Sequence, residues 1–267
     1  MTISCPLRSA GLLGGILLLS AASAGAADLA SLADGFYKAG FTADKLPAAV
    51  RERVASVDDR ALPFKELDFQ QSAAIKITGG GDVSSEASVR VIAQGGSLVT
   101  IMSTDQSTDT YAAIQYELSY RGLLVLRDQK YLPNMPIILQ SMRKPPANHT
   151  PIMEVQTMAM DPAVPVLSAG SRLTIDFAVA PSETPARAEK MRRVCQVGED
   201  FPAAKVSQAF TGNARVIACD LFDDAGRSRD LHQEKIYLDD YGVALLSKVV
   251  TSRMTADFSI SGVDVKR

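Results

Sequence analysis

Short β-type segments recur along most of this 267-residue chain, and turn-forming residues separate them. Gly79–Asp82, Thr211–Asn213 and Asp239–Gly242 are examples of these connectors. Connectors of this kind are typical of hairpins between antiparallel neighbours. No helical period separates the segments, which disfavours a βαβ fold. We therefore predict a mainly β fold of antiparallel meander sheets, forming a curved half-barrel or a sandwich, with an N-terminal helical segment.

The segments that predict strands share alternating polarity or β-branched residues. They are Ala73–Thr78, Ser88–Gln94, Leu98–Ser103, Tyr111–Tyr120, Leu123–Arg127, Ile152–Met160, Arg172–Val179, Lys205–Phe210, Ala214–Phe222, Glu234–Leu238, Val243–Thr251 and Met254–Ser261. We divide this region into a β region at 61–143, a proline-rich connection at 144–168 and a second β region at 169–267. Prolines are excluded from central strands, so the middle stretch is expected to hold edges and long connections.

Residues 27–60 have apolar side chains at helical spacing. One stripe consists of Leu29, Leu32, Phe36 and Ala39, and the next of Leu46, Val50, Val54 and Val57. Pro47 suits the first turn of the second helix, where its missing N–H costs little. This segment is expected to pack across a sheet.

The first 26 residues have the pattern of a secretory signal. Arg8 precedes an apolar run at 10–22, and Ala24–Ala26 provides the small residues that a signal peptidase recognises. The run is shorter than the roughly 20 residues that span a bilayer. We predict cleavage near Ala26 and export to a periplasm, with a mature protein that is not integral to the membrane.

Cleavage would leave two cysteines, Cys195 and Cys219. An even count in an oxidising compartment predicts one disulfide. The alternative is two separate buried thiols. Neither cysteine belongs to a Cys-x-x-Cys motif, so thioredoxin-like chemistry is disfavoured.

Composition excludes two classes of partner. The formal net charge is −2 and the 28 basic residues are scattered, whereas a nucleic-acid site needs them on one face. Tryptophan is absent and aromatic residues make up 6%, which disfavours a stacking platform for bases or sugars.

Few residues suggest catalysis. His149 and His232 are the two histidines, and no Gly-x-Ser-x-Gly elbow surrounds a serine. A hydrolase using His232, Asp230 and a distant serine is one hypothesis, and a solvated loop is the simpler interpretation. The aspartate pairs at 223–224 and 239–240 lie at turns, where aspartate bonds nearby backbone N–H groups. We predict no enzyme activity and no cofactor.

Methionines gather in the middle of the chain. Met153, Met158 and Met160 lie near His149, and thioethers with an imidazole suit Cu(I). A Cu(I) site is therefore one alternative. The methionines could instead fill irregular gaps, or they could line a flexible groove for an acyl chain.

The C-terminal part resembles uncharacterised bacterial periplasmic β-domains of half-barrel type, similar to lipoprotein carriers. The resemblance covers about 100 residues and rests on Leu167–Leu173, Cys195-Gln196-Val197, Cys219 and Ile236–Val243. It implies a fold and a compartment, and no reaction. The leading hypothesis is an exported, non-enzymatic β-protein that binds an apolar ligand, an envelope component or a protein partner.

Overall fold

The structure is a computed structural model, and it describes residues 40–57, 60–105, 113–131, 150–162 and 167–267. The predicted signal at 1–26 and the first helical stripe, at 29–39, lie outside the described residues. Among the described residues, no helix combines the length and apolar character needed to cross a membrane.

Strands dominate the described residues. The helical elements are η1 (Ala43–Lys45), α2 (Ala48–Val57), η2 (Pro185–Arg187) and η3 (Ala203–Lys205). The strands are β1 (Glu66–Ile77), β2 (Asp82–Ala93), β3 (Leu98–Asp105), β4 (Ala113–Tyr120), β5 (Leu124–Tyr131), β6 (Met153–Asp161), β7 (Arg172–Pro181), β8 (Glu189–Pro202), β9 (Asn213–Asp223), β10 (Ser228–Leu238), β11 (Val243–Val250) and β12 (Met254–Lys266).

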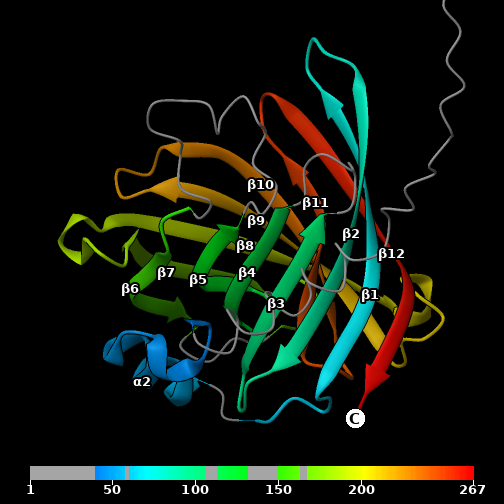
Figure 1. The fold of residues 1–267 in the computed structure, drawn as a ribbon, viewed down its shortest axis with the longest axis horizontal. Helices are drawn as coiled ribbons and strands as arrows, with labels where there is room; N and C mark the ends of the chain where they lie inside the picture. Colours follow the sequence, from blue (N-terminus) through cyan, green and yellow to red (C-terminus); the bar gives the residue numbers. More distant parts are fainter. Residues whose placement is uncertain (1–39, 58–59, 106–112, 132–149, 163–166) are drawn as a thin grey trace, which may run out of the picture.

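The strands form a closed antiparallel barrel (Figure 1). β1 pairs with β2 on one side and with β12 on the other, in a register from Glu66↔Lys266 to Ile77↔Met254. The half-barrel or sandwich that we predicted is therefore wrong, although the antiparallel meander is correct. Alternation specifies each strand locally, but closure depends on pairing between segments at opposite ends of the β region.

The strand predictions contain two local errors. β8 was missed because its outward positions are charged, as at Lys190 and Arg192, and its inward Arg193 breaks the apolar alternation. Residues 205–210 were predicted as a strand, but η3 and turns occupy this stretch. Its apolar Phe210 instead packs edge-on against Tyr241 at a centroid distance of 5.2 Å. β6 lies inside the 144–168 stretch that was expected to be a connection.

The junction between β5 and β6, called here the β5–β6 seam, is short. Its register contains only Arg127↔Glu154 and Asp128↔Met153. An ion pair joins the side chains of Arg127 and Glu154, which are 11% and 9% exposed. The Arg127 guanidinium also lies 5.9 Å from the centre of the Phe41 ring. Side chains therefore supplement a seam that has little backbone pairing.

Helix α2 matches the second predicted stripe. Leu46, Val50, Val54 and Val57 are buried in one apolar cluster with residues of β4, β7 and β8. Figure 1 shows α2 beside β6, and these two elements are in contact. The helix thus covers the apolar cluster near the β5–β6 seam.

Strand β4 is buried on one face and partly buried on the other. Ile114, Tyr116 and Leu118 belong to the cluster under α2. The alternate residues Gln115 and Glu117 line a cavity inside the barrel. The polar residues Gln115 and Glu117 therefore face the interior of the barrel rather than its outer surface.

Candidate ligand-binding site

The barrel contains a partly open cavity of about 310 Å³, which we call the barrel cavity. Residues from opposite sides of the barrel line it, and its apolar wall includes Phe69, Val89, Val91, Ile101, Leu246 and Phe258. A smaller hollow of about 150 Å³ shares Gln71, Ser103, Gln115 and Phe258 with it, so the two spaces adjoin. The interior is thus a shaped space with a mainly apolar wall.

Three charged side chains also line the barrel cavity: Glu117 of β4, Arg193 of β8 and Lys235 of β10. Lys235 and Arg193 are 7% and 9% exposed. Strand pairing places Asp128 of β5 opposite Glu117. Buried charges are costly unless they are paired or hydrogen-bonded, so this group needs a physical explanation.

Backbone carbonyls of the β4–β5 turn accept hydrogen bonds from both cations. The Lys235 ammonium donates to Gly122 O at 2.5 Å and to Leu123 O at 3.2 Å. The Arg193 Nη1 donates to Leu123 O at 2.8 Å. The cations therefore hold this turn against the strands β8 and β10.

Burial disturbs the titration of this group. Burial, followed by the charge of Arg193, lowers the pKa of Lys235 to about 7, and Glu117 opposes the change. Burial also lowers the pKa of Arg193 to about 10. The pKa of Glu117 is raised by burial and by Asp128, and that of Asp128 is raised by burial. All four changes disfavour the charged forms, as expected when water is excluded.

Gly122 allows the β4–β5 turn to lie close to β11. Its φ is 69°, in the left-handed region that favours glycine. The neighbouring Arg121 O accepts a hydrogen bond from Ala244 N at 2.8 Å. A Cβ at residue 122 would overlap the carbonyl oxygen of Ala244, and a backbone atom cannot easily move away.

Gly122→Ala is expected to destabilise the protein by about 2 kcal/mol more than Gly79→Ala, because overpacking adds to the backbone strain. Gly79 is the matched control, since its φ is 75° and no atom lies within 4 Å of its added Cβ. Urea denaturation of both variants measures the difference. Equal losses would show that the turn does not need its close approach to Ala244.

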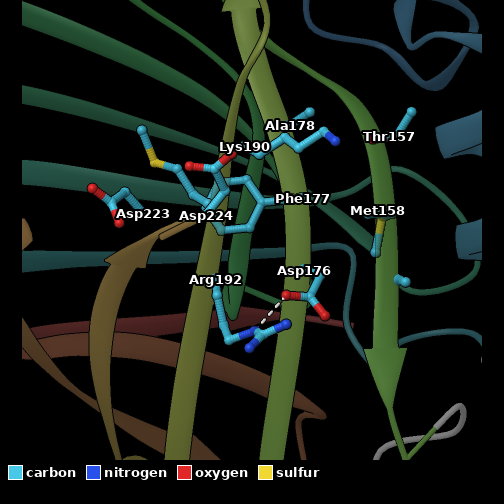
Figure 2. A pocket seen from close by; sticks show the side chains of 11 residues that line it. Thr157, Met158, Asp176, Phe177, Ala178, Lys190, Arg192, Asp223 and Asp224 are labelled. Atoms are coloured by element: carbon cyan, nitrogen blue, oxygen red, sulfur yellow. Dashed lines mark hydrogen bonds and ion pairs between the residues drawn. The ribbon is translucent and has the colours of Figure 1, made fainter. Parts of the chain in front are cut away.

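A second hollow, of about 340 Å³, lies across β6, β7 and β8 (Figure 2). Met158, Phe177 and Met191 occupy paired positions on these strands and share one face. Exposed charged groups surround them, including Arg192 and Asp176, whose Nε and Oδ1 atoms are 2.7 Å apart. This hollow is partly open to solvent, as the barrel cavity is, and residues of fewer strands line it.

The predicted disulfide is confirmed: Cys195 and Cys219 are bonded. They lie directly opposite each other on β8 and β9. Both side chains are buried within the apolar cluster. The bond therefore staples two neighbouring strands of the barrel wall.

The histidine and methionine candidates are only partly brought together. His232 Nδ1 lies 2.8 Å from Asp220 Oδ1, and its Nε2 lies 3.7 Å from Glu234 Oε1. Asp230 instead accepts hydrogen bonds from Ser252. The described neighbours of His232 are thus carboxylates, rather than the serine that a hydrolase would need.

For the copper hypothesis, Met158 and Met160 share one face of β6, as their pairing with Phe177 and Ile175 indicates. His149 lies outside the described residues, so the Cu(I) site stays a prediction. No group of three histidine, cysteine, aspartate or glutamate residues suited to a metal occurs within the described ranges.

The aspartate pairs support turns. Asp223 accepts hydrogen bonds from Ala225 N and Arg227 N, and the latter bond is the main cause that lowers its pKa. Asp240 accepts a bond from the Thr211 hydroxyl at 2.8 Å. Asp223 thus bonds backbone N–H groups of its own turn, as the turn interpretation predicts, whereas Asp239 and Asp240 bond Arg215 and Thr211, which are distant in the sequence.

The sequence interpretation missed Glu117, Arg193 and Lys235. In Ala113–Tyr120 the apolar residues occupy the even positions, which suggests that Glu117 points to solvent. Only a weak signal in the sequence could have identified Glu117 as an interior residue. The strands before and after its segment are apolar, which suggests that little of this part of the sheet faces solvent.

The fold and its interior define a closed antiparallel β-barrel with charged residues at one end of a mainly apolar cavity. No family model matches the chain, and searches of curated proteins and of solved structures likewise found no match. The resemblance to periplasmic half-barrel domains therefore stays a prediction.

Proposed function

We propose that this protein binds a small, mainly apolar ligand inside its barrel and does not catalyse a reaction. The observation that carries the proposal is the barrel cavity of about 310 Å³ and its apolar wall. Ligand sites in proteins are typically concave, mainly apolar spaces of about 300–1,000 Å³ with a few placed polar groups. The cavity matches both parts of that description.

The proposed place of action is outside the cytoplasm, in a periplasm. The disulfide between Cys195 and Cys219 supports this, since such bonds persist in oxidising compartments. The signal-like pattern of residues 1–26 supports it independently. A binding protein in that compartment would hold an apolar compound away from water.

Neighbouring residues on β3 provide a direct test. Ser103 lines the barrel cavity and the smaller hollow beside it. Thr104 follows it, points to the other face and lines a shallow outer hollow. Tryptophan at residue 103 would fill the interior, whereas tryptophan at residue 104 would remain outside.

The probe is N-phenyl-1-naphthylamine, a neutral dye whose fluorescence rises in apolar surroundings. We expect saturable binding to the unmodified protein, and a loss of about tenfold or more in Ser103→Trp because the added ring occupies the cavity. Thr104→Trp should bind the dye as the unmodified protein does. Equal binding by both variants, or no saturable binding at all, would overturn the proposed cavity site.

A further inference from the structure

The cations at the end of the barrel cavity have hydrogen-bonding capacity to spare. An ammonium has three donors and a guanidinium has five. Within the described part of the chain, Lys235 donates to two carbonyl oxygens, and Arg193 to one. Both side chains are more than nine-tenths buried and line the cavity. Two buried cations with unused donors therefore line one cavity.

The nearby carboxylate does not neutralise them by direct contact. Among the described residues, neither Lys235 nor Arg193 forms an ion pair. Glu117 instead accepts a hydrogen bond from Gln115 Nε2 at 2.6 Å. Its charge still acts on both cations, because it raises their pKa values against the effect of burial. Glu117 thus offsets part of the two positive charges, and the described hydrogen bonds leave donors of both cations without a carboxylate partner.

We infer that the ligand of the barrel cavity carries a carboxylate, which Lys235 and Arg193 bind while its alkyl body lies along Val91, Ile101 and Phe258. This inference rests on the proposed function and specifies its ligand class as an alkyl carboxylic acid. A carboxylate would accept charge-assisted hydrogen bonds from the unused donors of both cations. The apolar wall would exclude water from the chain of the ligand.

Glu117 sets the selectivity in this scheme. As an anion it would repel the carboxylate of the ligand, and as a neutral acid it could donate a hydrogen bond to it. Burial raises the pKa of Glu117, whereas the charge of Lys235 opposes this shift and favours the anion. Glu117→Gln keeps the shape and removes the charge, so it should strengthen binding of an acid.

The test compares three ligands of equal chain length, decanoic acid, decan-1-ol and decylamine, as competitors of the bound dye at neutral pH. We expect the acid to bind about tenfold or more tightly than the alcohol, because hydrogen bonds to charged groups are the stronger ones. Lys235→Met and Arg193→Met should remove this preference, measured in each variant as the ratio of the affinities for decanoic acid and decan-1-ol.

Lys235 and Arg193 also hold the β4–β5 turn, so either methionine variant could fail to fold. Glu117→Gln then decides the matter, since its described hydrogen bond is to Gln115 and not to the turn. A severalfold gain in the preference for decanoic acid over decan-1-ol supports the inference. No gain, or a loss, overturns it.

The outcomes separate this inference from the proposed function. If the dye binds in a Ser103-dependent way but the acid and the alcohol compete equally, the carboxylate site is overturned and the cavity site stands. A preference for decylamine, or a failure of decanoic acid to displace the dye, would likewise overturn the carboxylate site and leave the cavity site standing. If the dye does not bind inside the barrel, both proposals fail together.

Discussion

Glu154→Ala is expected to lower the free energy of unfolding by about 3–5 kcal/mol, the cost of leaving a buried charge without its partner. Arg127 would remain at the β5–β6 seam, 11% exposed and beside the ring of Phe41. Water cannot readily replace the lost carboxylate there. The seam has only two register pairs, so backbone hydrogen bonds offer little compensation.

Asp176→Ala is the matched control, because Asp176 forms an ion pair with Arg192 in which both side chains are more than half exposed. Exposed pairs contribute about 0–1 kcal/mol, so this variant should be nearly neutral. The double variant Arg127→Met with Glu154→Met should recover most of the stability, since it leaves no buried charge. Urea denaturation measures all three. Similar losses for Glu154→Ala and Asp176→Ala would contradict the role assigned to the seam.

Removal of the disulfide by Cys195→Ala with Cys219→Ala is expected to cost about 3.5 kcal/mol in the chain-entropy treatment of a loop of this length. The two cysteines are 24 positions apart and are joined across β8 and β9. Without the bond, the unfolded chain gains conformational entropy, whereas the folded barrel does not. Loss of two buried sulfurs adds a smaller packing term.

Urea denaturation with and without dithiothreitol provides the measurement and its control. The reductant should destabilise the unmodified protein by nearly the same amount as the double variant, and it should leave that variant unchanged. A loss below about 1 kcal/mol in both would contradict a stapling role for the bond.

Local patterns were sufficient for most strands and for α2, whose stripe at Leu46, Val50 and Val54 is buried as predicted. They were insufficient for closure. Nothing near Glu66 or near Lys266 indicates that these residues lie opposite each other. β8 shows the same limit on a smaller scale, because its charged residues conceal a strand that is buried on one side.

The candidate site was less accessible to prediction than the fold. Cys195 and Cys219 could be paired by counting, since two cysteines allow one bond. Glu117, Arg193 and Lys235 come from three distant strands, and each looks like an ordinary surface charge in its own segment. Only the closed barrel turns all three toward one space. The methionines that suggested an acyl-chain groove, Met158 and Met160 among them, do not line this cavity.

The pairing of β1 with β12 also has a consequence for biosynthesis. Of the barrel strands, β1 leaves the ribosome first and β12 last. The hydrogen-bonding groups of β1 that face β12 therefore stay unpaired until almost the whole barrel has been made. Contacts of such long sequence separation form slowly, and unpaired strand edges invite aggregation. The barrel is therefore expected to close only after β12 has been made, and a chain kept unfolded until then would avoid exposing a partly paired edge among other nascent chains.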